Sequence, residues 1–175
     1  MVDAQRQDTG SQSRHRLEGE GLVKRLSNGS VVILQISVDE LLDILFVRRL
    51  LDGEAAFLAA ERMESADVAS LIAESRVIVA NPEPSFDGFW RYDDRFHETI
   101  AHASAKPILA KTIVDLRSKA RMCHVKRMPG RFGDQAKEHL DVLLAIEAKD
   151  ARGAKKAMSH HFDWVRSRLL NWLGT

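Results

Sequence analysis

The sequence has little of several features that define common protein classes. It contains one cysteine, Cys123, so an internal disulfide framework is excluded. We expect this thiol to be buried, because it follows Ala120 in an amphipathic run. No apolar run approaches the ~20 residues of a membrane-spanning helix, and residues 1–14 lack the apolar region of a signal peptide. These absences predict a cytoplasmic protein.

The sequence also lacks an excess of charge of either sign. Lys and Arg number 26 against 25 Asp and Glu, which leaves a formal net charge of +1. Nothing in the overall charge favours binding to nucleic acid or membranes, so any such role must be local. With 175 residues, 45% of them hydrophobic and 29% charged, the chain is expected to form one globular domain with a buried core, or a domain with a small appendage.

Prolines are few, and they separate helical stretches rather than interrupt them. Six helices are predicted from the apolar spacing, over residues 38–63, 66–80, 85–104, 107–127, 132–149 and 151–173. The residues expected to cap four of them are Ser37, Ser65, Ser85 and Asp150. Short connections between long amphipathic helices predict an all-α antiparallel bundle over residues 37–175.

The first 36 residues differ from the rest of the chain. The first dozen are rich in Gln, Ser, Asp and Gly and are expected to be disordered. The stretch LVKRLSNGSVVIL, residues 22–34, has two short strand-like runs around Asn28-Gly29, the dipeptide that best tolerates the positive φ values of a tight turn. We predict a β-hairpin there, as the only β structure of the chain.

Two polar residues lie on the apolar face of the predicted helix 85–104. The apolar positions of that face are Phe86, Phe89, Trp90, Phe96, Ile100 and Ala103. Asp93 and His97 lie within this stripe, four residues apart. Their charged neighbours Asp94, Arg95 and Glu98 fall outside it, so the two are not explained as ordinary surface residues. They need buried partners.

Two histidines lie on the inner faces of the last two predicted helices. The inner face of helix 132–149 is formed by Ala136, Leu140, Leu143, Leu144 and Ile146. His139 falls within it. The inner face of helix 151–173 is formed by Ala154, Met158, Val165, Leu169 and Trp172. His161 completes that stripe, whereas His160 points about 100° away. Three helices are therefore expected to bring one aspartate and three histidines toward one interior.

A divalent metal ion would satisfy these four residues together. Two ligands four residues apart can come from one helix, as Asp93 and His97 would, and the two histidines of other helices could complete the set. The alternative is that each histidine is a core residue hydrogen-bonded to a carbonyl, which is commoner for a lone inward histidine. Their coincidence on three helices favours the metal. Of the other histidines, the sequence assigns His15, His102 and His160 to the surface and leaves His124 open.

An arginine lies on the inner face of the first predicted helix. That face is formed by Leu41, Leu45, Asp52, Ala55 and Ala59. Arg48 falls within it and would offer a planar fork suited to the carboxylate of a small ligand. An internal salt bridge to Asp52 or Glu54 is an equally open explanation.

The sequence offers little for catalysis. His97-Glu98 begins like the HExxH helix of zinc proteases, but residue 101 is alanine, so the second histidine is missing. A metal could still activate water, but hydrolysis also needs a base, and the nearest carboxylates, Glu138 and Asp94, lie off the inner faces. A metal-dependent hydrolase or lyase therefore stays the alternative to a binding site, and a purely structural zinc site is a third possibility.

Three stretches of the chain carry longer motifs. They are DELLDILFVRRLLDGEAAFLAAERM, DDRFHETIAHASAKPIL and KEHLDVLLAIEAKDARGAKKAMSHHF. They contain a D-x-x-F-H motif from Asp93 to His97, an E-H pair at His139, an M-x-x-H motif that ends at His161, and a spacing of 22 residues between the last two histidines. Over residues 38–173 the chain resembles the FCD effector domain of GntR-type bacterial transcription regulators.

The resemblance implies a fold and a function. Such domains are all-helical bundles that bind a divalent metal, receive small organic acids at or near it, and commonly form homodimers. The implied metal ligands are Asp93, His97, His139 and His161. Zinc is the first candidate, with nickel or manganese as others. Arg48 corresponds to a conserved arginine of the family and would contact the carboxylate effector, and Asp52 stands where the family has glutamate. The resemblance implies a ligand-sensing regulator with no catalytic residues, rather than an enzyme.

The stretch RLEGEGLVKRLSNGSVVIL resembles the end of a winged helix-turn-helix, with the tip of its wing at Asn28-Gly29. The residues assigned to DNA contacts are Arg14, Arg16, Lys24, Arg25 and Asn28. The first two helices of such a module have no counterpart, and Arg14 stands where the family has a leucine. Whether this start is truncated or natural, we expect the polypeptide to bind operator DNA weakly if at all. A gel shift with nanomolar retention on a family-type palindrome would contradict this expectation.

Overall fold

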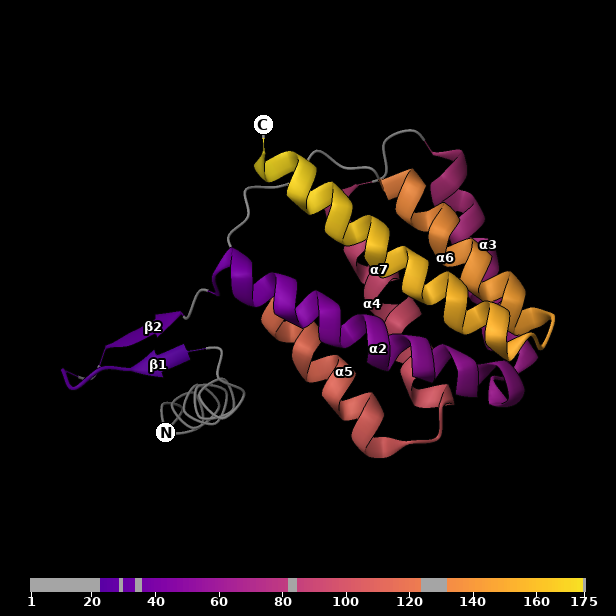
Figure 1. The fold of residues 1–175 in the computed structure, drawn as a ribbon, viewed down its shortest axis with the longest axis horizontal. Helices are drawn as coiled ribbons and strands as arrows, with labels where there is room; N and C mark the ends of the chain where they lie inside the picture. The colour runs from indigo at the N-terminus through magenta and orange to yellow at the C-terminus, as the bar shows by residue number, and fades with distance from the viewer. Residues whose placement is uncertain (1–22, 29, 34–35, 82–84, 124–131, 175) are drawn as a thin grey trace, which may run out of the picture.

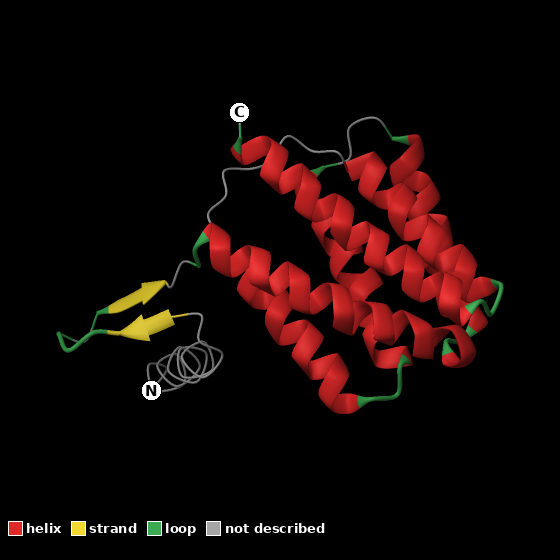
Figure 2. Ribbon diagram, viewed as in Figure 1, coloured by secondary structure: helices red, strands yellow, loops and turns green. Residues whose placement is uncertain are grey.

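The computed structural model describes residues 23–28, 30–33, 36–81, 85–123 and 132–174 (Figure 1). In chain order the elements are β1 (Val23–Arg25), β2 (Val31–Ile33), α2 (Val38–Arg62), α3 (Ser65–Ala80), α4 (Phe86–Ala103), α5 (Pro107–Ala120), α6 (Phe132–Glu147) and α7 (Ala151–Leu173). Apart from the hairpin, every element of the described segments is a helix (Figure 2). The predicted all-α bundle of six helices, preceded by a β-hairpin, is confirmed within these segments.

The predicted hairpin around Asn28 is present. Strands β1 and β2 pair antiparallel with Arg25 opposite Val31, and the Leu26 N–H donates to the Ser30 carbonyl at 2.8 Å. Asn28 accepts a hydrogen bond from the Ser30 N–H through its side-chain Oδ1 (3.0 Å), and its φ is not positive. The Asn28 side chain therefore helps to close the turn, without the positive φ that the Asn-Gly pattern suggested for this residue.

Side-chain caps begin three of the helices as predicted. Ser37 Oγ accepts from the Glu40 N–H, Ser85 Oγ from the Gly88 N–H, and the Asp150 carboxylate from the Gly153 N–H, at 2.9–3.1 Å. Each bond satisfies an N–H group that has no partner within its helix. The prediction for α3 is wrong. Ser65 is the first residue of that helix, and Glu64 precedes it without a side-chain cap bond.

Two helices end more than one residue earlier than predicted. Helix α5 stops at Ala120. The Arg121 N–H still donates four residues back, to Arg117, but those of Met122 and Cys123 donate three residues back, to Lys119 and Ala120, which tightens the chain into a turn. The rest of the predicted stretch to residue 127 lies outside the described residues. Helix α6 stops at Glu147, because Lys149 adopts a φ of 58° and the chain turns there toward α7.

Helix α2 packs along α7, α3 packs along α6, and α6 also packs on α7 (Figure 1). Helices α4 and α5 pack on α2. Four fully buried alanines of α2 contribute to the main apolar core: Ala55, Ala56, Ala59 and Ala60. The largest fully buried apolar side chains are Phe89, Phe96, Leu71, Ile100, Ile113, Leu143, Ile146 and Met158. The bundle thus has a continuous core to which all six helices contribute.

Some predicted burial assignments are wrong. On α6, Leu144 is 39% exposed and Val142 is fully buried. The buried face of the helix is therefore rotated slightly from the face that the apolar residues predicted. Cys123 is only half-buried, since it lies in the turn after α5, where its thiol is 3.9 Å from the Ser37 carbonyl oxygen. Among the described residues, no helix combines the length and the apolar character needed to cross a bilayer.

Candidate metal centre

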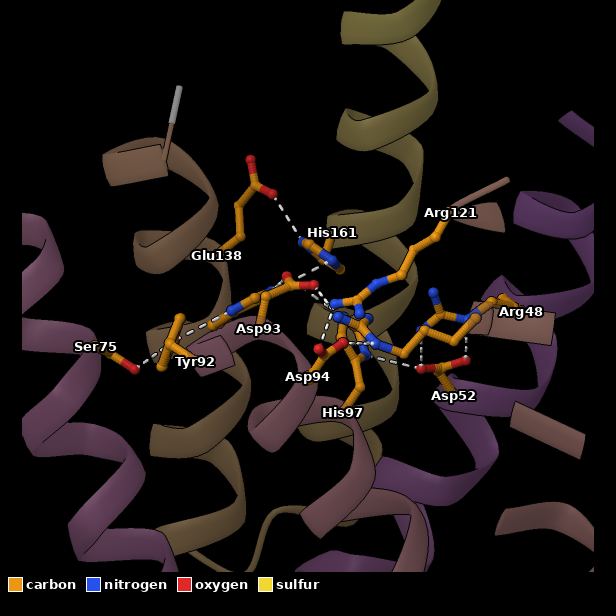
Figure 3. A network of polar contacts seen from close by, with 12 residues as sticks. Arg48, Asp52, Ser75, Tyr92, Asp93, Asp94, His97, Arg121, Glu138 and His161 are labelled. Atoms are coloured by element: carbon orange, nitrogen blue, oxygen red, sulfur yellow. Dashed lines mark hydrogen bonds and ion pairs between the residues drawn. The ribbon is translucent and has the colours of Figure 1, made fainter. Parts of the chain in front are cut away.

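Three helices bring the four predicted ligands together. Helix α4 supplies Asp93 and His97, α6 supplies His139 and α7 supplies His161. All four are buried, with at most 5% of their surface exposed. The close-up view shows the labelled members of this group pointing toward one another between the helices (Figure 3).

The donor atoms of the group lie at distances that suit one ion. The Nε2 atoms of His139 and His161 are 3.4 Å apart, and Asp93 Oδ1 lies 3.6 Å from His139 Nε2 and 4.0 Å from His97 Nε2. One nitrogen from each histidine lies within 4.8 Å of the others. Two ligands that are each about 2.1 Å from a metal lie about 3.4 Å apart in tetrahedral geometry. The residues present therefore fit a metal ion.

The outward nitrogen of His97 is held by a charged pair. Its Nδ1 lies 2.8 Å from Asp52 Oδ1, and because a carboxylate only accepts, Nδ1 carries the proton. Arg48 in turn donates to both oxygens of Asp52, from Nη2 at 2.8 Å and from Nε at 3.2 Å. This arrangement leaves His97 Nε2 as a bare lone pair that faces the cluster.

His161 is held in the same way by a different pair. Its Nδ1 lies 2.9 Å from Glu138 Oε2, and Arg168 donates to both oxygens of that carboxylate. Burial opposes the ionisation of Glu138, but the bonds from Arg168 and His161 outweigh it and lower the pKa of the carboxyl group. His161 therefore donates from Nδ1 to this carboxylate and turns its Nε2 toward the centre.

The third histidine has neutral partners. His139 Nδ1 lies 3.1 Å from the hydroxyl of Tyr92, which is 2.7 Å from Ser75 Oγ. The His139 ring also stacks on Phe96, with ring centroids 3.8 Å apart and planes within 9°. The phenylalanine of the D-x-x-F-H motif thus fixes the plane of an imidazole on another helix.

The charge states of the cluster suit a cation. Burial, with Arg48 and other nearby positive charges, lowers the pKa of His97 well below its usual value. Burial and the neighbouring His161 do the same for the pKa of His139. Burial opposes the ionisation of Asp93, but the Arg117 guanidinium together with the His97 and His139 rings holds the pKa of that carboxyl well below its usual range. Neutral imidazoles and an ionised carboxylate are the forms that bind metals.

Arg117 is the main residue that sequence reasoning missed. It is 5% exposed on α5 and donates to Asp93 Oδ2 and, at 2.6 Å, to Asp94 Oδ1. This contact leaves Asp93 Oδ1 to face the histidines. A signal was present, because Arg117 follows the buried Ile113 by four residues and so lies on the inner face of its helix.

The two carboxylates considered as catalytic bases both have cationic partners. Glu138 is held by Arg168 and lies closer to the cluster than predicted, at the outward side of His161. Asp94 is paired with Arg117 and Arg121. Neither is placed as a free base beside the Nε2 atoms.

The other predicted site residues have varied outcomes. Arg48 is buried and forms the internal salt bridge to Asp52, with its guanidinium 4.8 Å from the Phe162 ring centroid. Its role toward an effector stays a prediction.

His102 and His160 are exposed as predicted. Lys24 and Arg25 lie in β1 and Asn28 in the hairpin turn, and their DNA contacts stay predictions. The positions that lie outside the described residues are Arg14, His15, Arg16 and His124.

A cavity of about 290 Å³ lies between α6 and α7, beside His161 of the candidate centre. Its lining residues include Glu138 and His161 from the centre, with Lys156, His160 and Trp164 around its mouth. A larger groove of about 600 Å³ lies between α2, α3 and α4, and none of the four candidate ligands lines it. Of these two hollows, the smaller one therefore has a candidate ligand, His161, in its lining.

A family model described as the FCD domain matches residues 43–163. A protein named as a regulator of the L-lactate dehydrogenase operon in Escherichia coli strain K12 is 29% identical over 134 residues, which are 73% of this chain and 50% of that protein. The chain therefore spans about half the length of the curated relatives that it matches.

Solved structures share the fold. E. coli McbR/YncC superposes with a TM-score of 0.78 at 18% identity, over 93% of this chain and 79% of that one. The Zn²⁺-bound FCD domain of TM0439 superposes with a TM-score of 0.64 at 14% identity, over 78% of this chain and 96% of that one. At these identities the likeness shows the fold alone.

Proposed function

The chain belongs to the FCD domain family, and from that premise we propose that it is the ligand-sensing part of a GntR-type transcription regulator. In this proposal a divalent metal inside the bundle receives a small organic acid, and its binding changes how two protomers present their DNA-binding parts. The relative named as an operon regulator and the regulator titles of the structural neighbours support this assignment.

The observation that carries the proposal is the convergence of four donor atoms in a dry interior. Contacts of 3.4–4.0 Å between their donor atoms join three imidazoles and one carboxylate. Each imidazole has its Nδ1 bonded to a group outside this cluster. Lone pairs and a carboxylate that face one another repel unless a cation lies among them. Outer partners on the second nitrogen are the usual arrangement around metal-bound histidines.

The residues that would hold the metal are Asp93, His97, His139 and His161. Zinc is the first candidate, because it favours imidazole with carboxylate and because a neighbour of the same fold is titled as Zn²⁺-bound. Nickel and manganese are the other candidates. When bound, the ion would supply a Lewis acid with open positions that a carboxylate can occupy.

The effector would be a small carboxylate that enters through the cavity beside His161. Lys156 lines this cavity together with the carboxylates Glu138 and Asp141, and its ammonium group is the one that can pair there with an anion. We propose that Arg48 acts on the effector, although its Nε and Nη2 already serve Asp52. It would then contribute through Nη1 or through the positive potential that it adds beside His97.

The DNA and dimer assignments rest on the family and on the relatives. The chain spans half of its curated relatives, and the residues assigned to DNA contacts lie in the N-terminal segment. We propose that DNA is bound through a winged helix-turn-helix where one is complete, and that the functional unit is a homodimer. Nothing in the site favours the hydrolase or lyase alternative, because Glu138 and Asp94 are both tied up in ion pairs.

Metal content and ligand-dependent stability test the proposal. Purified protein should contain about one zinc, nickel or manganese per chain, and chelation with EDTA should lower its melting temperature. A thermal-shift screen of mono-, di- and tricarboxylates, with L-lactate among them, should then find acids that stabilise only the metal-loaded protein. A ligand at 100 times its Kd adds about 2.7 kcal/mol. A protein that binds none of these ions tightly would contradict the proposal.

Neighbouring histidines of α7 provide a matched pair of variants. His161→Ala removes a buried member of the cluster and should abolish stoichiometric metal binding and the acid-dependent shifts. His160→Ala removes an exposed imidazole one residue away and should leave the metal content unchanged. Equal metal loss in both variants would show that the ion binds elsewhere.

A further inference from the structure

The hydroxyl of Ser75 has a fixed hydrogen-bond direction. Ser75 is fully buried on α3, and its Oγ lies 2.7 Å from the Leu71 carbonyl oxygen. A carbonyl oxygen only accepts, so the single proton of the serine hydroxyl points to Leu71. Toward its other neighbour, the hydroxyl of Tyr92 at 2.7 Å, Ser75 can therefore act only as an acceptor.

This direction sets that of Tyr92. Because Ser75 can only accept at this contact, the Tyr92 O–H must donate to it. A tyrosine hydroxyl has one proton. Toward His139 Nδ1, 3.1 Å away, the Tyr92 oxygen can then only accept. His139 must therefore carry its proton on Nδ1.

The other two histidines do not need such a device. Their Nδ1 atoms face the carboxylates of Asp52 and Glu138, which accept and never donate when ionised. A tyrosine oxygen can donate or accept, so Tyr92 alone would allow His139 either tautomer. In the wrong one, Nε2 would carry a proton 3.6 Å from Asp93 and would offer no lone pair to a metal.

We propose that Ser75 and Tyr92 form a directional hydrogen-bond relay that holds His139 protonated at Nδ1 and keeps its Nε2 available to the metal. The two are positioning residues, since they act on the centre through His139. The consequence for zinc rests on the proposed function, whereas the tautomer is a property of the metal-free chain. Figure 3 shows Ser75 and Tyr92 on the side of the centre away from Arg48.

The first test measures the tautomer directly. Long-range ¹⁵N–¹H correlation spectra of the full metal-free chain, labelled at histidine, distinguish a proton on Nδ1 from one on Nε2. His139 should be protonated at Nδ1. In Ser75→Ala the Tyr92 O–H loses its acceptor and can turn to His139 Nδ1, so the Nε2-protonated form should appear. An Nε2-protonated His139 in the unaltered protein would overturn the proposal, even if the variants failed to fold.

The second test measures zinc affinity by competition with a chelator. Loss of an outer partner of a ligand typically weakens metal binding 10–100-fold, and we expect about tenfold for Ser75→Ala and for Tyr92→Phe. The control is Ser104→Ala, which removes an equally buried hydroxyl that also donates to a carbonyl oxygen but does not contact the centre. Its zinc affinity should be unchanged.

The outcomes separate this relay from the proposed function. If Ser75→Ala folds and leaves the tautomer of His139 unchanged, the relay is wrong whether or not zinc binds. If the tautomer shifts as expected but the unaltered protein binds no metal, the relay stands and the metal function fails. Equal loss of zinc affinity in Ser104→Ala and Ser75→Ala would mean that buried hydroxyls matter only for packing, which overturns the relay.

Discussion

The interior of the bundle has two parts that are built by opposite means. Around His139 the contacts are polar, with four buried candidate ligands and an outer layer of arginines, carboxylates and hydroxyls. Toward the C-terminal end of α6, around Ile146, the interior is apolar and is filled by alanines of α2 and branched side chains of other helices. Both parts exclude water to a similar degree.

The difference is in what each part needs in order to be stable. The apolar part gains from removal of its surface from water and requires no partner beyond the chain. The polar part brings charges and lone pairs out of water, which is costly unless each is paired. Its outer layer meets that need only on the outward side. On the inward side, the proposed cation would meet that need, so the two parts should respond differently to mutation and to metal.

The largest expected effect comes from Arg117→Met in the metal-free protein. The change leaves Asp93 buried with its principal cation removed, and breaking a buried pair typically costs 3–5 kcal/mol. We expect a loss of about 4 kcal/mol in the free energy of unfolding, measured by urea denaturation, and a smaller loss with zinc bound. The control is Arg121→Met, which removes a cation that is 42% exposed and should cost less than about 1 kcal/mol. Equal losses would contradict the account of Arg117.

The next effect tests the apolar part. Ile146→Ala removes a fully buried side chain two turns from His139 and should cost about 3 kcal/mol, within the usual range for such truncations. Because no charge is exposed by the change, we expect the same loss with zinc and after EDTA. A loss that depends on the metal would show that the two parts are coupled.

A smaller effect concerns the outer layer of the polar part. Glu138→Gln keeps a hydrogen-bonding group beside His161 Nδ1 but removes the charge. Zinc affinity should fall about tenfold, as measured by chelator competition. Without the carboxylate at Nδ1 the imidazole is less basic, so its Nε2 binds the metal more weakly. The exposed Glu147 of the same helix gives the control, and Glu147→Gln should bind zinc like the unaltered protein.

The smallest effect is expected at the surface. Arg49→Ala removes a two-bond ion pair with Asp163, whose side chains are 37% and 50% exposed. Solvent-exposed ion pairs of this kind contribute less than about 1 kcal/mol to the free energy of unfolding. We expect the same small loss with and without zinc. A larger loss would mean that the contact between α2 and α7 depends on this pair more than on its apolar face.

The sequence pattern was sufficient to place the helices and to pick out the four buried polar residues that the structure brings together. Asp93, His97, His139 and His161 could be found because a polar residue at a position that a 3.6-residue period assigns to the core is conspicuous. The same test applied to the fifth helix would have found Arg117. Boundaries were harder, because the end of α5 at Ala120 precedes the nearest proline by several residues.

The outer layer could not be predicted from the sequence. Tyr92 reads as an ordinary aromatic core residue, and Ser75 as a small residue within a helix, until three-dimensional contacts bring their hydroxyls together. Glu138 lies beside an inner face rather than on it, and only the packing of α6 on α7 turns its carboxylate toward His161. Periodicity finds which face a residue occupies but not which atoms on that face meet.

The turn between α6 and α7 has a consequence for how this protein can vary. Lys149 adopts a φ of 58°, and the Asp150 N–H donates back to the Ala145 carbonyl oxygen at 2.9 Å, which closes the connection within three residues. His139 precedes the end of α6 by eight residues and His161 follows the start of α7 by ten, so both imidazoles lie about 12–15 Å from the turn. The short turn therefore fixes how α6 and α7 are aligned, and this alignment brings His139 and His161 opposite each other. Among homologous chains, insertions in the turn between α6 and α7 should be found only where the histidine that corresponds to His139 or to His161 has been lost.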